Sequence, residues 1–315
     1  MSMMETDISF VIPNVCTIQM IRAFLDTMAP IFEMKGKRVE HVNLVVRDIK
    51  RMDIVGVLLV YKVVEYTSRK KCFNSPKLLA DSKFVVELQK KGFRELMESF
   101  VKGFPPNFET LKYQFYDNVF IAPIKLNAIS ESEAEIGYIP MIQSFYEDQE
   151  TCAVVLSVLA EIVSNFHEHA QDDSDSILVA KGNKDNFEVV CADTGVGVVS
   201  SMAKSKLFQD IRPTQRFNVL AKATEKGITS KQNSDHMGYG LWLIQEFVLK
   251  TKGVLQLYSE GAYYVNQCGK IKKGTCGFWQ GTIIYVSLPL NNIGELQKWQ
   301  TEQAALYEDI KINCV

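Results

Sequence analysis

One apolar stretch, CAVVLSVLAEIVSNFHEHA at 152–170, constrains the fold of this chain more than any other segment. Its apolar side chains recur at spacings of three and four residues, which predicts an amphipathic helix. Glu161, Asn165 and His169 are four residues apart, so they share one face of that helix. A carboxylate, an amide and an imidazole on one face can meet a single ligand, and an amide oxygen suits Mg²⁺ already held by phosphates and water. The alternative is an ordinary exposed polar stripe.

A second block follows the run FEVVCA at 187–192, which is typical of a strand. Asp193 comes directly after this run, at the start of a turn that contains Gly195 and Gly197. The two glycines permit a positive φ or a close approach of the backbone to a ligand. A carboxylate there can accept a hydrogen bond from an exocyclic amine such as that of adenine, and a ligand without this donor leaves the carboxylate unpaired. The alternative is a plain Asp-Thr-Gly turn between a strand and a helix.

A third block contains the glycine pair Gly238 and Gly240, which leads directly into LWLIQEFVLKTKG at 241–253. The apolar spacing of this segment predicts a helix that ends with Gly253 as its C-cap. Backbone amides at the start of a helix can hold phosphate. A lone pair of glycines often makes only a turn, so its position after the first two blocks matters more than its letters.

With Gly281 and Thr282 in QGTIIYVSLP at 280–289, these blocks resemble the GHKL family of ATP-binding domains. The family is named for gyrase, Hsp90, histidine kinases and MutL. The resemblance covers about residues 150–290. It implies a Bergerat-type α/β sandwich with a mixed sheet, and ATP and Mg²⁺ as cofactors.

The resemblance implies a role for each block. Glu161 would orient or deprotonate the attacking nucleophile, and Asn165 would bind the Mg²⁺ ion. Asp193 would accept from the adenine amine, with the hydroxyl of Thr282 in support. Glycines of the base pocket and residues at the phosphates complete the implied set: Gly195, Gly197, Gly238, Tyr239, Gly240 and Leu241.

Two residues near Asn165 need separate treatment. Phe166 departs from the family, which usually carries a small residue after the asparagine, so local helix packing must differ there. His169 is a further candidate for a phosphate contact, with a solvent-facing side chain as the alternative. We do not expect the HEH trio at 167–169 to bind zinc, because residues two apart on a helix face different ways and the HExxH spacing is absent.

The polar and basic segment 199–237, between the second and third blocks, is long for a simple connection and predicts a closing lid. Its composition indicates helical character around 215–226 and a flexible part in GITSKQNSDHMG at 227–238. Thr229, Ser230 and Lys231 are its candidate nucleotide contacts. The alternative is that its basic side chains only solvate the surface.

The first 110 residues have a different rhythm, which predicts a separate small α/β domain. Its expected elements are strands at 8–14 and 41–46 and helices at 17–34, from Ile54 and at 82–103. Asp53 can cap the helix that starts at Ile54, and Gly56 permits close packing. The sequence DIVGVLL at 53–59 resembles the Asp-x-x-Gly-Leu helix start of STAS domains, the sulfate-transporter and anti-sigma-antagonist fold.

In antagonists of the STAS family a phosphorylatable serine precedes the glycine, and Val55 stands there in this chain. The resemblance therefore implies a docking or regulatory module rather than a phospho-switch in cis. The alternative is an unrelated α/β domain with a buried apolar helix. We expect three parts, namely a STAS-like domain at 1–110, the ATP-binding domain at 111–298 and a helical tail at 299–315, with a strand at 119–126 that joins the second domain's sheet.

Composition limits the class of protein and its partners. A length of 315 residues suggests about two domains, and 47% hydrophobic residues can supply their cores. The formal net charge of −2 argues against a protein that coats polyanions, so we expect no nucleic-acid partner, with a local basic patch that binds nucleic acid as the alternative. Seven scattered cysteines without a CxxC pair indicate neither a disulfide framework nor a zinc ribbon. The chain shows no signal-peptide pattern and no membrane-spanning stretch, and we expect a cytoplasmic protein.

Three functions stay open at this point. We favour an ATP-binding regulator in which Mg²⁺-dependent hydrolysis is coupled to lid closure and partner binding. The alternatives are a serine/threonine protein kinase of the anti-sigma-factor type, with Glu161 as its base, and a nucleotide-sensing scaffold that does not hydrolyse ATP. The expected partner is another protein, either STAS-like or a second copy of this chain.

Overall fold

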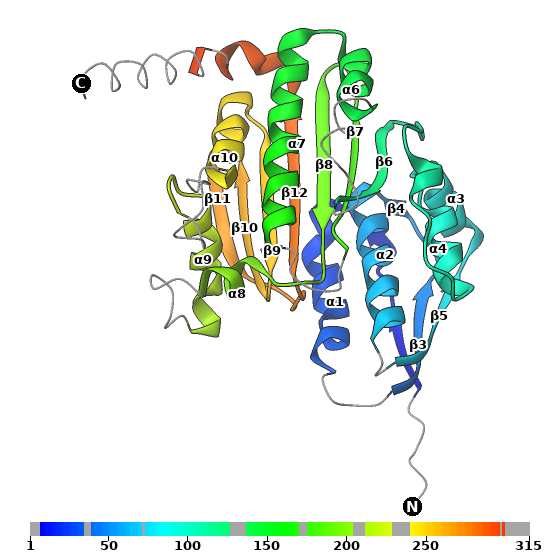
Figure 1. Ribbon diagram of the computed structural model, residues 1–315. Helices are drawn as coiled ribbons and strands as arrows, with labels where there is room; N and C mark the ends of the chain where they lie inside the picture. The colour runs from blue at the N-terminus through cyan, green and yellow to red at the C-terminus, as the bar shows by residue number, and fades with distance from the viewer. Residues whose placement is uncertain are drawn as a thin grey trace, which may run out of the picture.

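The structure, a computed structural model, describes residues 7–34, 39–70, 73–126, 137–169, 175–203, 212–228, 240–296 and 298–299. Over these residues the chain is a mixed α/β protein built on a seven-stranded sheet and a three-stranded sheet, with a small two-stranded sheet beside them (Figure 1). No helix in the described ranges has the length and apolar character needed to cross a membrane.

The three-stranded sheet is parallel and has the order β1-β3-β5. Each parallel step needs a crossover, and a helix supplies each one. The elements of this part are β1 (Asp7–Val11), α1 (Ile21–Glu33), β3 (Val39–Val46), α2 (Ile54–Arg69) and β5 (Phe73–Ala80). The predicted small α/β unit is therefore present, and its STAS character stays a prediction. Strand β5 was not predicted from the sequence, and its Pro76 suits an edge strand because proline cannot donate to a ladder.

The start of α2 confirms the expected cap and the expected close packing. Asp53 accepts hydrogen bonds from the amides of Gly56, at 2.9 Å, and Ile18, at 2.7 Å. A Cβ atom at position 56 would lie 2.1 Å from the carbonyl oxygen of Cys16. Cys16 belongs to β2 (Val15–Cys16), which pairs with β4 (Arg51–Met52). Glycine is required because the helix lies directly on this small sheet.

The segment 82–103 forms two helices, so the prediction of one helix there was wrong. They are α3 (Ser82–Lys90) and α4 (Arg94–Val101). Gly92 separates them with a φ of +75°, a conformation that ends a helix and that glycine adopts readily. A Cβ atom on Gly92 would lie 3.0 Å from the ring of Tyr116, so this turn is also packed closely.

The seven-stranded sheet has the order β11-β10-β9-β12-β8-β7-β6, and all its described pairs are antiparallel. The mixed sheet that the resemblance implied is not what these strands form, because short connections such as those between β7 and β8 and between β9 and β10 favour antiparallel neighbours. The strands are β6 (Val119–Lys125), β7 (Ile177–Gly182), β8 (Asn186–Ala192), β9 (Val254–Ser259), β10 (Ala262–Gln267), β11 (Lys270–Thr275) and β12 (Thr282–Pro289). The strand predicted at 119–126 is confirmed as β6, at one edge.

Helices cover one face of this sheet and bury a hydrophobic core there. Figure 1 shows α7 running along the strands beside α10. The helices of this part are α6 (Ile139–Tyr146), α7 (Gln149–His169), α8 (Val198–Ala203), α9 (Arg216–Ala223) and α10 (Gly240–Thr251). Within the described ranges, short 3-10 helices lie at Ile18–Met20, Glu109–Leu111, Pro213–Gln215 and Leu290–Asn292. The helix α9 confirms the helical character expected around 215–226.

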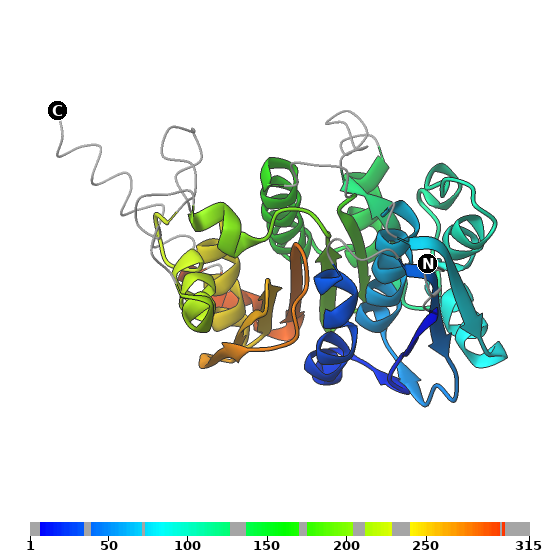
Figure 2. The same ribbon diagram turned by 90° about the horizontal axis from the view of Figure 1, so that it is seen from below.

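The other face of the large sheet packs against the N-terminal part. Figure 2 shows α1 and α2 beside this sheet, and α2 contacts β7 and β8 on one side and β5 on the other. All residues of α2 from Ile54 to Thr67 are buried, Lys62 and Glu65 included, because the helix lies between the two sheets. One hydrophobic core contains side chains from both parts, including Phe32 of α1 and Trp279 ahead of β12.

Candidate functional site

The first block lies on α7, as predicted. Apolar side chains of α7 such as Val155, Val158 and Ile162 are buried in the core over the large sheet. Glu161 and Asn165 lie on another side of the helix and are partly buried. The side-chain nitrogen Nδ2 of Asn165 donates to the backbone oxygen of Glu161 at 2.7 Å. This bond orients the side chain, so Oδ1 is the atom of Asn165 that suits a cation.

The start of α10 brings the third block to the first. A Cβ atom on Gly240 would lie 2.6 Å from Oε2 of Glu161 and 3.0 Å from Nδ2 of Asn165. The backbone of Gly240 therefore lies directly against the two polar side chains of α7. A larger residue at position 240 would push the ends of these two side chains aside. Leu241 follows in the first turn of α10 and is partly buried.

Asp193 lies at the end of β8 and is only 3% exposed. Its Oδ1 accepts from the amide of Gly195 at 2.6 Å, and its backbone oxygen accepts from Nε1 of Trp279 at 2.9 Å. Burial raises the pKa of this carboxyl from 3.8 to about 7, against the opposing effects of the Gly195 amide and the charge of Lys62. This carboxyl therefore ionises at a higher pH than an ordinary aspartate.

The fourth block lies against Asp193. Gly281 has a φ of +96°, and a Cβ atom there would lie 2.4 Å from Oδ1 of Asp193. The amide of Asp193 donates to the backbone oxygen of Thr282 at 3.0 Å, where β12 begins. Thr282 is 8% exposed. The contact that its hydroxyl was expected to make stays a prediction, since the bond seen here involves its backbone.

The turn after Asp193 is packed closely against other residues of the chain. A Cβ atom on Gly197 would lie 2.5 Å from Oγ of Ser259 and 2.4 Å from Oε2 of Glu260. Ser259 ends β9 and Glu260 begins the connection to β10, and neither was among the predicted site residues. A signal was present, since a glutamate before a glycine between two strands is an unusual hairpin turn.

A buried lysine near the same carboxyl was also missed. Lys62 on α2 is 0% exposed, donates to the backbone oxygen of Asp175 at 2.5 Å and forms an ion pair with Glu65. Its charge lowers the pKa of Asp193, so it opposes the effect of burial. A single lysine inside the apolar run VLLVYKVV was the available signal.

Several expected contacts lie outside the described residues. These are Thr229, Ser230, Lys231, Gly238 and Tyr239. His169 is the last residue of α7, and its side chain also lies outside that range. In the part of the chain that the structure describes, no group of three or more His, Cys, Asp or Glu residues could hold a metal ion.

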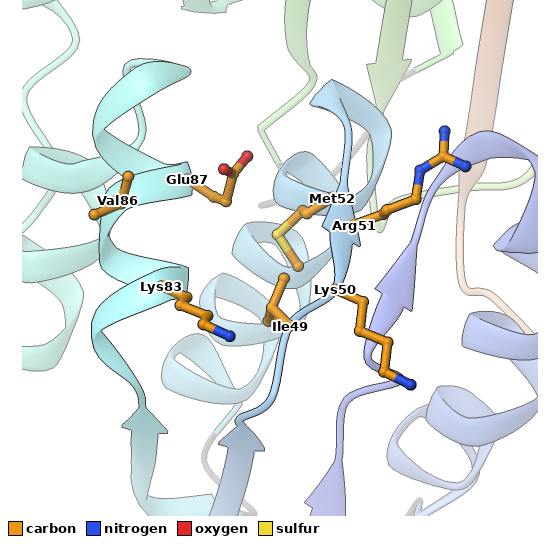
Figure 3. Close-up of a pocket in the computed structure, with 7 residues that line it drawn as sticks. All are labelled: Ile49, Lys50, Arg51, Met52, Lys83, Val86 and Glu87. Carbon is orange, nitrogen blue, oxygen red and sulfur yellow. The ribbon is translucent and has the colours of Figure 1, made fainter.

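A pocket of about 220 Å³ lies elsewhere, between α3 and the segment 49–52 (Figure 3). Figure 3 shows Lys83 and Glu87 projecting from α3 toward Ile49 and Met52, whereas Lys50 and Arg51 point away from α3. Glu87 also forms ion pairs with Lys90 and Lys91. The pocket contains none of the residues of the four sequence blocks.

Comparisons with known proteins leave the family open. No protein-family model matches the sequence, and no curated protein matches it. Among solved structures, the chain is similar to the B-subunit of the DNA gyrase from Myxococcus xanthus, at a TM-score of 0.25 and 9% sequence identity. The similarity covers 47% of this chain and 40% of the gyrase chain, so this protein matches less than half the length of that chain. A likeness this weak carries no functional argument.

Proposed function

We propose that this protein binds ATP with Mg²⁺ between α7, the Asp193 turn and the start of α10, and uses Glu161 to hydrolyse it. Nucleotide binding and hydrolysis would change a protein-binding surface, so the protein would act as a regulator. Four sequence blocks resemble those of GHKL proteins, and the proposal extends their implied roles to this chain.

The approach of Gly240 to Glu161 and Asn165 is the observation that carries the proposal. Two segments far apart in the sequence meet there without room for even one methyl group. Because amides at the start of a helix can hold phosphate, this approach would bring them and the two polar side chains of α7 to one ligand. Gly281 makes a similar approach to Asp193. The first and third blocks therefore meet at one glycine, and the second and fourth blocks meet at another.

The residues present fit an adenine nucleotide with its metal. Asp193 is a buried acceptor for the adenine amine, and the amides at the start of α10 would hold phosphate. Asn165 would bind Mg²⁺ through Oδ1, whose orientation is set by the bond of its Nδ2 to the helix backbone. When bound, the Mg²⁺ ion would neutralise charge on the phosphates.

Glu161 is the general base in this proposal. Its carboxylate lies on the same side of α7 as Asn165, one helical turn earlier, so it can face a nucleophile next to the metal-bound phosphates. The role of the carboxylate is to orient a water molecule and to accept its proton. Glutamine at this position keeps the shape of the side chain but removes most of its basicity.

The test uses γ-labelled ATP with Mg²⁺ and follows both free phosphate and labelled protein. We expect the wild type to release free phosphate and Glu161→Gln to bind ATP while losing at least about 100-fold in turnover, the range for general bases. Glu150→Gln, an exposed carboxylate at the other end of α7, is the matched control and should turn over normally. Asp193→Asn should lose ATP binding.

Each result has a separate meaning. Normal ATP affinity in Asp193→Asn would contradict the adenine site, and normal hydrolysis in Glu161→Gln would contradict the base. Transfer of the label to an added STAS-like partner protein, or to this chain itself, would instead identify a protein kinase. ATP binding without release or transfer in any mixture would identify a nucleotide-sensing scaffold.

A further inference from the structure

The connection between β9 and β10 contains a strained residue. Glu260 and Gly261 form the whole two-residue loop, with φ values of +50° and +84°. Positive φ at both positions is typical of a type I′ hairpin turn, in which Asn, Asp or Gly is preferred at the first position. A glutamate in this conformation costs about 1 kcal/mol or more. Strain of this kind points to a role for the side chain.

The side chain of Glu260 reaches across to the start of α8. Its Oε2 accepts from the amide of Ser200 at 2.7 Å, and its Oε1 accepts from the Ser200 hydroxyl. A carboxylate that accepts from a backbone amide in the first turn of a helix satisfies a donor that has no partner within the helix. This carboxylate comes from a hairpin 60 residues further along the chain, so the contact is tertiary.

Further hydrogen bonds of the β9–β10 hairpin hold the start of α8 and its surroundings. Oγ of Ser259 accepts from the amide of Val198 at 3.0 Å and donates to the carbonyl of Gly281 at 2.8 Å. The backbone oxygen of Glu260 accepts from Nη1 of Arg216, on α9, at 2.8 Å. The hairpin therefore connects the turn after Asp193, the glycine that lies against Asp193, and the helix α9 of the predicted lid segment.

We propose that Glu260 is a positioning residue for the nucleotide, because its carboxylate holds the start of α8 and thereby fixes the turn from Asp193 to Gly197 that receives the base. The inference rests on the proposed function and adds a residue that the sequence blocks do not include. This role requires no direct contact between Glu260 and the nucleotide. It acts through the backbone amide of Ser200 and through its close contact with Gly197.

Glu260→Asn separates this role from a general structural one. Asparagine adopts positive φ more readily than glutamate, so the hairpin itself should become more stable. Its side chain is one methylene shorter and does not reach Ser200. Loss of a negative charge would by itself favour an anionic nucleotide, so weaker binding would be opposite in sign to the simple electrostatic effect.

Glu260→Gln is the matched variant, because it keeps the length of the side chain and an oxygen that accepts from the Ser200 amide. We expect Glu260→Asn to have an unfolding temperature equal to that of the wild type or higher. It should bind Mg²⁺-ATP about tenfold more weakly, which is the scale of one lost hydrogen bond to a charged group. Glu260→Gln should bind within about threefold of the wild type. Calorimetric titration and thermal unfolding give both quantities.

A measurement without nucleotide tests the same contact. Hydrogen exchange of the Val198 and Ser200 amides should become faster in Glu260→Asn and stay slow in Glu260→Gln. Unchanged exchange and unchanged affinity in Glu260→Asn would overturn the inference while leaving the ATP site intact. An equal loss of affinity in both variants would also overturn it, because the oxygen acceptor is retained in one of them. Failure of the wild type to bind ATP, with exchange altered as expected, would overturn the proposed function and with it the role in nucleotide binding.

Discussion

At the scale of single residues, Asp193 is a carboxyl group in a place that disfavours its charge. Burial is the main reason that its pKa is raised to about 7, and the nearby charge of Glu260 acts in the same direction. Lys62 and two backbone amides oppose this effect without cancelling it. The ionised form is therefore the one that gains most from a ligand that donates a hydrogen bond.

The free energy of unfolding of the ligand-free protein should depend on pH because of Asp193. Because the folded-state pKa is raised above 3.8, the folded protein holds this proton between about pH 4 and pH 7 while the unfolded chain releases it. Asp193 should therefore lower the free energy of unfolding as pH rises through that window, by up to about 1.4 kcal/mol per pH unit, with no further loss above it.

Thermal unfolding of the wild type and of Asp193→Asn between about pH 4.5 and pH 8 measures this effect, which is expected to reach about 1.4 kcal/mol per pH unit. The wild type should lose stability relative to the variant up to pH 7 or so. A constant difference between the two proteins across the range would contradict a raised pKa at this position.

At the scale of elements, glycines decide how the helices approach their neighbours. Gly240 begins α10 against the polar face of α7, and Gly253 follows its end. The expected C-cap at Gly253 is only partly as predicted: Lys252 adopts the positive φ, at +59°, and the amide of Gly253 donates to the oxygen of Val248 at 2.8 Å. A Cβ atom at 253 would lie 2.3 Å from the carbonyl oxygen of Ser287, so glycine is needed there for proximity to β12.

Gly240→Ala should impair the site more than the fold. The added methyl group overlaps the ends of the Glu161 and Asn165 side chains, which can move, so the expected loss is in ATP turnover and affinity, by about tenfold or more for side chains displaced by an ångström. Gly294→Ala is the control, since no atom lies within 4 Å of the position of its Cβ. Steady-state hydrolysis and thermal unfolding measure both effects. Wild-type turnover in Gly240→Ala would show that the approach of α10 is not required.

At the scale of the whole molecule, the two parts of the chain share a core. Phe32 of α1 packs on Trp279 with ring centroids 5.0 Å apart, and the indole nitrogen of Trp279 donates to the backbone of Asp193. The buried helix α2 adds Lys62, whose bond to Asp175 connects it to the start of the large sheet's β7. Packing therefore continues from the parallel sheet to the residue proposed to bind adenine.

The shared core predicts that the protein unfolds in one cooperative transition. Removal of the N-terminal part from the large sheet would expose a set of buried apolar side chains, which is unfavourable by about 25 cal/mol for each Å². Differential scanning calorimetry measures the outcome, and the calorimetric enthalpy should equal the van't Hoff enthalpy. Two separated transitions would indicate that the contact between the parts is weak.

Local spacing in the sequence was sufficient for the elements of the site. Glu161 and Asn165 share a face of a helix because of their separation, Asp53 caps α2 because of its position before the helix, and Asp193 follows a strand whose apolar run is visible in the sequence. These features depend on residues within a turn or two of each other. Their physical cause is therefore contained in a short window of the chain.

Tertiary structure alone decided which distant segments meet. The antiparallel order of the large sheet, the position of α2 between two sheets and the contact of Glu260 with Ser200 join residues far apart in the chain. No short window encodes such contacts, because they depend on how the whole chain closes and on which apolar faces cover one another. For the same reason the raised pKa of Asp193 follows from its burial in the folded protein, where Trp279 and Gly281 lie against it, rather than from its neighbours in the sequence.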